Sequence, residues 1–335
     1  MPSPATQLPP LKHRTEHRTY LITGASSGLG LALATQLAAQ AAQGGHPAHT
    51  CLILPMRDPP GAEAARARIL AAGQVTLFTP ALDLACLPQV RAFTRELGSL
   101  LSGRQLDGVL LNAGVQAAQQ LHFTADGLER TFVVNHLAHH LLAHALLPCL
   151  APGAVMGWTA SGTHDPCEPS ARLFGFRGAR YRSLTALAEG RYERRAWTPR
   201  TQACRDAYAS AKLCNIVSAR AFASAHGQRA HFFAFDPGLM PGTGLAREQP
   251  AWMRQAWHRL LPALARVLPG ASTPTRSAAV LLRLLTAAHA APSRNGVYVD
   301  FRGQARQPSR LARMPWVEAD LMQGSDALLH RLAGA

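Results

Sequence analysis

The chain has 335 residues, of which 47% are hydrophobic, and a formal net charge of +15. This length fits one α/β domain as well as two average domains, and the apolar fraction is that of a globular protein with a sizeable core. The positive charge comes from arginines spread along the chain and not from a basic run. Composition therefore argues against nucleic-acid binding and leaves open a peripheral contact with an acidic membrane surface.

The sequence shows no recognisable targeting signal. No segment reaches the roughly 18 consecutive apolar residues of a transmembrane helix, and the N-terminus lacks the apolar stretch of a secretory signal, so we expect a cytoplasmic protein. The six cysteines have no paired spacing, which indicates reduced thiols. Residues 1–18 lack hydrophobic periodicity and predict a flexible leader.

Short apolar runs alternate with longer helical patterns from residue 19 to about residue 301. The predicted strands are 20–23, 51–54, 75–78, 108–111, 154–159, 231–235 and 296–301. The predicted helices are 29–42, 62–72, 90–101, 126–150 and 208–225. Apolar strands separated by helices predict a single doubly wound, Rossmann-type α/β domain over 19–301, with a mostly parallel seven-stranded sheet and helices on both faces.

Two insertions, residues 162–205 and 239–270, interrupt this alternation, and 302–335 is left as a C-terminal tail. Both insertions leave the carboxyl end of a predicted strand, where ligands of this fold bind. Their aromatic residues are Phe174, Phe176, Tyr181, Tyr192, Trp197, Trp252 and Trp257. These side chains either line a large apolar pocket or pack the insertions onto the domain, and the sequence leaves both readings open. The amphipathic basic pattern within 239–270 is that of a solvated lid helix or of a segment resting on a membrane surface.

A glycine-rich loop follows the first predicted strand. A dinucleotide pyrophosphate needs backbone amides at a helix N-terminus and no Cβ in the way. Gly24 permits the turn, Gly28 the close approach of the phosphates, and Gly30 the packing of helix on strand. This context predicts that the loop holds a nucleotide, with the contact residues Gly24, Ser26, Ser27, Gly28, Leu29 and Gly30.

The end of the second predicted strand bears on the choice between NAD and NADP. An acidic residue there accepts the ribose hydroxyls of NAD and repels a 2′-phosphate. Here the strand runs into Arg57, and Asp58 follows directly behind it. We therefore predict NADP(H) as the cofactor, with Arg57 beside its 2′-phosphate.

Tyr208 and Lys212 are four residues apart on a predicted helix and so share one face. A neighbouring ammonium favours the phenolate and lowers the pKa of a tyrosine from its ordinary value near 10. The chain has 34 lysines and arginines, and only Lys12 and Lys212 are lysines, which suits chemistry that needs a compact ammonium. The alternative is a Tyr–Lys pair on a solvated helix face, which the upstream glycine-rich loop disfavours.

The Gly-x3-Gly-x-Gly spacing resembles the short-chain dehydrogenase/reductase family. Over roughly residues 19–301 the resemblance continues through Asp83, Asn112-Ala113-Gly114, Asn135, Ser161, Tyr208-x3-Lys212 and Pro237-Gly238. It implies that Tyr208 exchanges a proton with the substrate oxygen, that Lys212 also binds the nicotinamide ribose, and that Ser161 polarises the substrate carbonyl. It further implies that Asn135 positions a relay water, unless its side chain bonds its own helix backbone. Implied cofactor contacts are Asp83 against the adenine, then Asn112, Ala113, Gly114, Pro237, Gly238 and Thr243.

Within the family, longer stretches resemble the protochlorophyllide reductases and their retinol-dehydrogenase-like neighbours, and Cys214 matches a cysteine of the former. That group carries a cysteine directly after the Pro-Gly, where this chain has Leu239. We therefore expect hydride transfer to or from a carbonyl or alcohol of a bulky apolar substrate, with light-dependent protochlorophyllide reduction as the alternative. A non-catalytic redox sensor is a third reading, which the presence of Ser161, Tyr208 and Lys212 disfavours.

Two further expectations concern partners and metals. The family often pairs through the helices that carry Asn135 and Tyr208, and long insertions block such pairing, so a monomer and a homodimer both stay open. His136, His140 and His144 recur at a helical spacing typical of metal ligands. No carboxylate or cysteine joins them along that stripe, and the family needs no metal, so we expect none.

Overall fold

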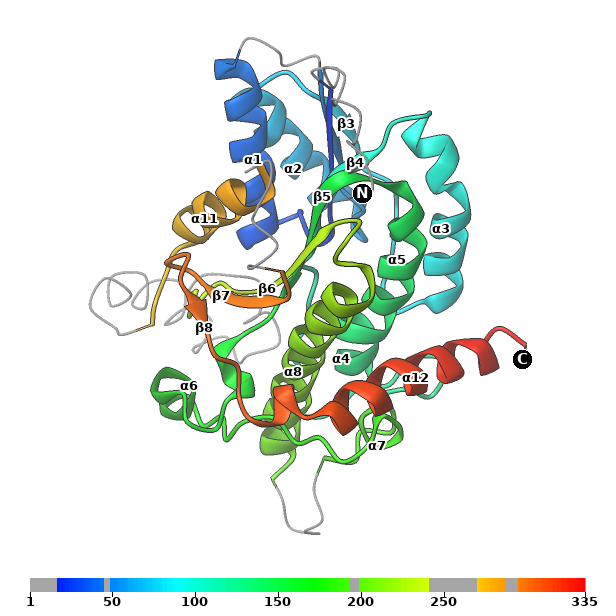
Figure 1. Cartoon of the computed structure of the whole chain (residues 1–335), viewed down its shortest axis with the longest axis vertical. Coiled ribbons are helices and arrows are strands. Elements are labelled where there is room, and N and C mark those ends of the chain that lie inside the picture. Colours follow the sequence, from blue (N-terminus) through cyan, green and yellow to red (C-terminus); the bar gives the residue numbers. More distant parts are fainter. Residues whose placement is uncertain (1–16, 45–48, 193–198, 241–269, 287–294, 335) are drawn as a thin grey trace, which may run out of the picture.

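A single eight-stranded sheet forms the centre of the computed structural model, which describes residues 17–44, 49–192, 199–240, 270–286 and 295–334. The strand order is β3-β2-β1-β4-β5-β6-β7-β8, with β7 and β8 at one edge (Figure 1). The strands are β1 Arg18–Ile22, β2 Thr50–Ile53, β3 Thr76–Phe78, β4 Leu106–Leu111, β5 Leu150–Thr159, β6 His231–Asp236, β7 Val297–Asp300 and β8 Ala305–Arg306. The order reverses between β1 and β4, which is the switch point where doubly wound sheets bind nucleotides.

The predicted single doubly wound, mostly parallel domain is confirmed, but the predicted count of seven strands is wrong. β1 to β7 pair in parallel, and β8 adds an antiparallel edge through the pairs Tyr298–Arg306 and Val299–Ala305. Sequence patterning missed β8 because it has two exposed residues and no apolar run.

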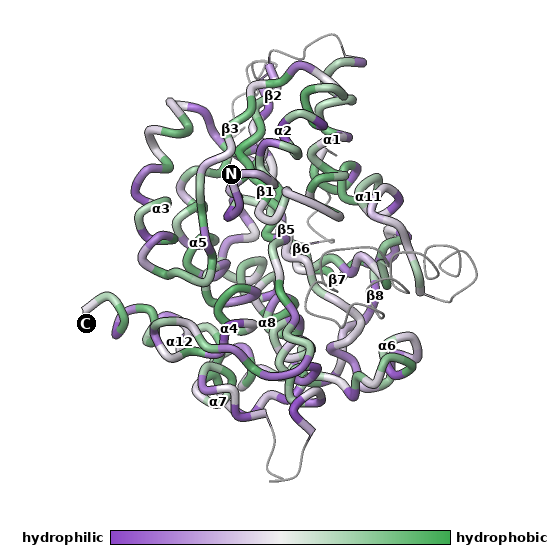
Figure 2. The backbone as a smooth tube through the Cα atoms, turned by 180° about the vertical axis from the view of Figure 1, so that it is seen from behind, coloured by the Kyte–Doolittle hydropathy of each residue, from purple (hydrophilic) through white to green (hydrophobic). Residues whose placement is uncertain are grey.

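Helices cover both faces of the sheet, because alternate residues of each apolar strand point to opposite sides. In β1, Leu21 belongs to one hydrophobic cluster, whereas Tyr20 and Ile22 belong to the other. The cluster around Ile22 is closed by α1 Gly28–Gln43, α2 Pro59–Ala72 and α11 Pro274–Thr286. The cluster around Leu21 is closed by α3 Leu87–Leu101, α5 Ala138–Leu146 and α8 Arg200–His226. Figure 2 shows the hydrophobic strands between these layers.

The predicted helix 126–150 is not continuous. Glu129 caps a short α4, Arg130–Phe132, through hydrogen bonds from the Thr131 and Phe132 amides at 2.8 and 2.7 Å. A π-helical turn, Val133–Leu137, then leads into α5, and β5 already begins at Leu150. The apolar periodicity ran across all three elements and hid their boundaries.

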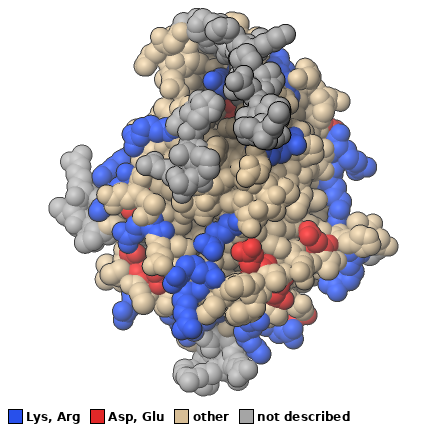
Figure 3. Space-filling view, in the orientation of Figure 1, with Lys and Arg blue, Asp and Glu red and all other residues tan. Residues whose placement is uncertain are grey.

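The first insertion carries two short helices, α6 Pro169–Leu173 and α7 Leu184–Ala188. The second insertion lies almost entirely outside the described residues, together with Thr243, Trp252 and Trp257. None of the described helices has the length and the apolar character needed to cross a lipid bilayer. On the face seen in Figure 3, basic side chains are scattered around the molecule with acidic ones among them.

The segment 302–335, predicted as a tail, is part of the fold over its described residues. It contains β8 and α12 Pro315–Arg331, which packs against α7 and α8 (Figure 1). Val317 and Leu321 of α12 are buried in the same hydrophobic cluster as residues of α8. The sequence pattern predicted only a tail because the strand is too short and the helix is only weakly amphipathic.

Candidate active site

The glycine-rich loop between β1 and α1 has the shape that the sequence predicted. Gly24 and Gly28 have φ angles of +69° and +59°, a region that favours glycine. A Cβ on Gly24 would lie 2.7 Å from Cα of Ala113, and one on Gly30 would lie 2.5 Å from the Gly24 carbonyl oxygen. The N-cap residue Ser27 is extended, and its side chain makes no capping hydrogen bond. The first amides of α1 therefore suit the phosphates of a dinucleotide.

Asn112 braces this loop from the end of β4. Its Nδ2 donates to the Thr23 carbonyl at 3.0 Å, and Thr159 at the end of β5 donates to its Oδ1 at 3.1 Å. The Thr23 hydroxyl oxygen accepts from the Asn112 and Ala113 amides at 2.8 and 3.0 Å. Thr23 was not among the predicted site residues, although its place at the end of the first strand was a signal for it.

Arg57 and Asp58, predicted to choose the nucleotide, and Asp83, implied against its adenine, follow β2 and β3. Arg57 is exposed four residues after β2 ends at Ile53. The Asp58 carboxylate accepts from the Gly61 amide at 3.1 Å and caps α2, so it is engaged by the helix. Asp83 accepts from the Ala85 amide at 3.0 Å in the turn before α3.

The structure brings Ser161, Tyr208 and Lys212 together where β5 meets α8. Tyr208 is hydrogen-bonded to Ser161, and its ring centroid lies 5.5 Å from the Lys212 Nζ. Nζ itself donates to the Thr159 carbonyl at 2.8 Å. Tyr208 and Lys212 are both buried, so the solvated-face alternative is excluded.

The electrostatics of this group differ in one respect from expectation. Burial and the Asp236 carboxylate raise the pKa of Tyr208, and the hydrogen bond with Ser161 only partly offsets them. Burial lowers the pKa of Lys212 to about 8, against the opposing effect of Asp236. The pKa of Tyr208 is therefore raised and not lowered as predicted, chiefly because the folded chain removes the hydroxyl from solvent.

Asp236 is a site residue that the sequence analysis missed. It ends β6 directly before Pro237, where its carboxylate accepts from the Gly238 amide at 3.0 Å and from the Tyr298 hydroxyl at 2.9 Å. Burial raises its pKa despite these hydrogen bonds. Its position in the strand-end Asp-Pro-Gly was the available signal.

A cavity of about 610 Å³ opens beside this group, and we call it the active-site cavity. Its wall includes Ser161, Tyr208, Asp236, Leu239 and the insertion residues Phe174 and Phe176. Tyr181 and Tyr192 point elsewhere, because their hydroxyls donate to Asp320 and Glu129 at 2.8 and 3.0 Å. Both readings of the insertion aromatics are thus correct in part, and Trp197 lies outside the described residues.

The model of the short chain dehydrogenase family matches residues 18–157. Protochlorophyllide reductase A of Oryza sativa subsp. japonica is 33% identical over 247 residues, which cover 68% of this chain and 59% of that protein. A WW domain-containing oxidoreductase of Drosophila melanogaster is 30% identical over 320 residues, which cover 94% of this chain and 69% of that protein. The chain belongs to the short-chain dehydrogenase/reductase family.

This short-chain dehydrogenase/reductase spans about 59% of the length of the rice protein that it matches. Among solved structures, the NADPH-bound carbonyl reductase from chicken fatty liver superimposes with a TM-score of 0.57 at 19% identity, covering 87% of this chain and 99% of that one. That likeness shows the fold alone. Together the comparisons confirm the predicted family, its resemblance to the protochlorophyllide reductases, and an oxidoreductase class.

The two positions compared with the protochlorophyllide reductases, the departure at Leu239 and the match at Cys214, can now be placed in this short-chain dehydrogenase/reductase. Leu239 lines the active-site cavity, so the hydrophobe that replaces their cysteine lies at the site itself. Cys214 is fully buried in the hydrophobic core, and burial raises the pKa of its thiol. Neither position therefore offers a reactive thiolate to a substrate.

Asn135 lies in the π-helical turn, a feature frequent at functional sites. Its Oδ1 accepts from the Val115 amide at 2.8 Å, and its Nδ2 donates to the Val115 carbonyl at 3.0 Å. The side chain therefore does not bond its own helix backbone. A Cβ on Gly114 would lie 3.3 Å from Asn135 Oδ1 and 3.5 Å from Lys212 Nζ, so this glycine keeps room between the two side chains.

His164 is a second residue that the motifs did not reveal. The Ser309 amide donates to its Nε2 at 3.1 Å, so Nδ1 carries the proton and donates to the Ser161 carbonyl at 2.7 Å. Burial lowers the pKa of His164, which agrees with this neutral form. The ring thus links Ser161, at the end of β5, to Ser309 in the segment that follows β8.

Proposed function

We propose that this protein uses NADPH to reduce the carbonyl group of a bulky, largely apolar substrate, with Tyr208 as proton donor. The supporting observation is that Ser161 and Tyr208 meet in the wall of a cavity of about 610 Å³, beside the buried Lys212. When bound, the nicotinamide supplies the hydride to the carbonyl carbon. The chain's own residues supply orientation and the proton.

The proton is held for transfer to the substrate oxygen. The Ser161 hydroxyl donates a hydrogen bond to that oxygen, and Tyr208 Oη releases its proton to it, which gives the alcohol. The Lys212 ammonium then stabilises the phenolate. Burial, and after it the Asp236 charge, raises the pKa of Tyr208, while burial lowers the pKa of Lys212 to about 8 against the opposing effect of Asp236. Both groups therefore keep their protons near neutral pH, the state in which Tyr208 can donate one.

NADP is favoured over NAD because Arg57 is exposed after β2 while Asp58 is engaged in capping α2. Replacing Arg57 by alanine should therefore weaken NADPH binding about tenfold or more and leave NADH binding nearly unchanged. Fluorescence titration of both cofactors on both proteins measures this. Equal losses for NADPH and NADH would place the 2′-phosphate elsewhere.

The position of Arg205 indicates a second chemical group on the substrate, besides the reacting carbonyl. It lies one helical turn before Tyr208 on α8, lines the active-site cavity and packs beside Gly175. Within the described residues its guanidinium has no hydrogen bond or ion pair, and it is partly buried. The cavity wall also contains Arg302 and Arg306, but Arg205 is the cation one helical turn from Tyr208. It suits a substrate with a carboxylate or second carbonyl about one helical turn from the reacting group.

The substitution Arg205→Met tests whether Arg205 binds a carboxylate or second carbonyl of the substrate. For a ketone or aldehyde that bears a carboxylate, we expect KM to rise about tenfold with kcat little changed, because uniform binding is lost. The matched substrate without the carboxylate should show a much smaller change. Equal effects on the two substrates would show that Arg205 acts only on the shape of the cavity.

The first experiment is NADPH oxidation in the dark against bulky apolar aldehydes and ketones, with and without a carboxylate. Turnover supports carbonyl reduction. NADPH binding without turnover on any carbonyl would overturn it and favour two other readings. The first is light-dependent protochlorophyllide reduction, which is suggested by the relatives of that name and is assayed under illumination. The second is a redox sensor, which would bind NADPH but reduce neither the carbonyl compounds nor protochlorophyllide.

A further inference from the structure

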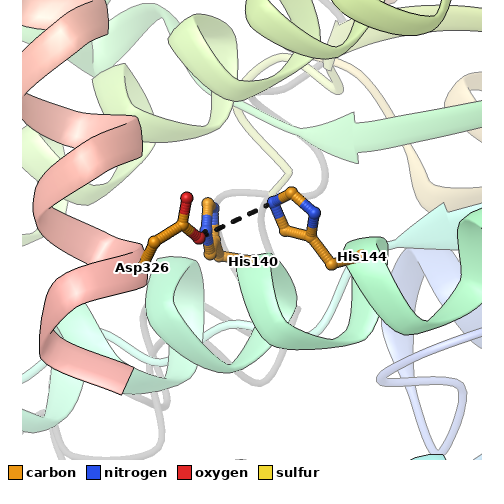
Figure 4. Close-up of side chains that lie close together, drawn as sticks. All are labelled: His140, His144 and Asp326. Atoms are coloured by element: carbon orange, nitrogen blue, oxygen red, sulfur yellow. Dashed lines mark hydrogen bonds and ion pairs between the residues drawn. The ribbon is translucent and has the colours of Figure 1, made fainter. Parts of the chain in front are cut away.

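The histidine stripe of α5 meets a carboxylate of α12. His140 Nε2 lies 2.7 Å from Asp326 Oδ1, and His144 Nε2 lies 3.9 Å from the same oxygen (Figure 4). Within the described part of the chain, one ligand atom from each of the three residues lies within 4.8 Å of the other two. The expectation that no carboxylate joins the stripe is therefore wrong, because a helix far along the sequence supplies one.

We propose that His140, His144 and Asp326 bind a divalent transition metal, with Zn²⁺ as the class that fits best. Two imidazoles at i and i+4 on one helix and one carboxylate are three ligands of the kind that zinc prefers, with water left for the fourth position. Nothing in the reductase chemistry uses these residues, since they lie on α5 and α12 and not in the wall of the active-site cavity.

The distances allow a metal to enter with small movements. In a tetrahedral zinc site with bonds of about 2.0–2.1 Å, neighbouring ligand atoms lie roughly 3.4 Å apart. The observed separations from Asp326 Oδ1, 2.7 and 3.9 Å, lie on either side of this value. The His140 side chain is 0% exposed and fixed, whereas His144 and Asp326 are 41% and 62% exposed and have room to turn toward a metal.

The proton on His140 must move before a metal can bind. His140 Nε2 and Asp326 Oδ1 share a hydrogen bond of 2.7 Å, so coordination through Nε2 requires that its proton shift to Nδ1 or leave for solvent. The Nδ1 atom of His140 is buried without a partner among the described residues. Because this nitrogen lacks the usual orienting acceptor, we expect modest rather than extreme affinity.

A bound metal would fasten α12 to the helix that follows the Asn135 turn. The two elements are already joined by His140–Asp326 and by a hydrogen bond of 2.9 Å between His136 Nε2 and the Ser325 hydroxyl. Coordination would add a third link, through His144. The site therefore acts on the stability of the C-terminal packing and not on hydride transfer.

Calorimetric titration of the EDTA-treated full chain with ZnCl₂ tests the proposal. The wild type should bind Zn²⁺, and His144→Ala and Asp326→Asn should each weaken this site at least about tenfold. ZnCl₂ should raise the Tm of the wild type and not that of His144→Ala. Because both altered side chains are exposed, the variants should unfold near the wild-type Tm in EDTA.

His17→Ala is the matched control. His17 is exposed, and its Nε2 lies 3.2 Å from Nδ1 of the half-buried His49, so these two residues are another histidine pair to which Zn²⁺ could bind nonspecifically. Loss of the Zn²⁺-dependent rise in Tm in His144→Ala, with retention in His17→Ala, assigns the site to α5 and α12. Equal Zn²⁺ affinity in the wild type and His144→Ala, or a loss in His17→Ala alone, would overturn it.

Discussion

Replacing Tyr208 by phenylalanine is expected to lower kcat by about 10²–10⁴-fold, the usual contribution of a positioned proton donor. Tyr208 is buried beside Ser161, and phenylalanine keeps the ring while removing the one group able to protonate the substrate oxygen. NADPH affinity should stay nearly unchanged. The measurement is steady-state NADPH oxidation with the best carbonyl substrate, together with cofactor titration.

Tyr181→Phe is the matched control, because it also removes a buried hydroxyl, one that donates to Asp320 at 2.8 Å and is not in the wall of the active-site cavity. It should lower the Tm and keep kcat. Turnover retained by Tyr208→Phe would remove Tyr208 from the proposed role. Loss of turnover in both variants would point to a general loss of packing instead.

Replacing Lys212 by methionine is expected to stabilise the cofactor-free protein while abolishing turnover. Burial lowers the pKa of Lys212 from 10.5 to about 8, so keeping an ammonium there costs free energy of folding on the order of 3 kcal/mol at pH 7. Methionine fills a similar volume without charge. The Thr159 carbonyl would still accept from Asn215 Nδ2 at 2.9 Å and is not left unpaired.

The burial of Lys212 also predicts how the free energy of unfolding changes with pH. Below about pH 8 both the folded and unfolded chains carry the ammonium, so the cost of burial is fully present. Between about 8 and 10.5 the unfolded chain binds the proton and the folded chain does not, so the stability of the wild type rises with pH. Urea unfolding at pH 7 and pH 10 should therefore show an advantage of the methionine variant that shrinks as pH rises. A variant less stable at both pH values would show that the Lys212 contacts outweigh its burial.

The fold was largely predictable because apolar strands alternating with helical patterns leave few topologies. The boundaries failed where apolar periodicity continued across a change of element, as from Glu129 through the π-helical turn to β5. β8 and α12 were missed because their place depends on tertiary contacts. The buried face of α12 is defined by α7 and α8, which its own sequence does not reveal.

The residues of the candidate site also fall into those that the sequence predicted and those that it did not. Residues at motif spacing, such as Gly24, Tyr208 and Lys212, were predicted because local geometry fixes them. Asp236 and Arg205 were not, because only the folded chain shows that both line the same cavity as Tyr208. The raised pKa of Tyr208 was also beyond the sequence, since it depends on how completely the folded chain excludes water.

The position of α12 also determines the surroundings of α8. Its buried Val317 and Leu321 belong to the same hydrophobic cluster as Leu213 and Val217 of α8. The helix that holds Tyr208 is therefore packed between the sheet on one side and the C-terminal segment of the same chain on the other.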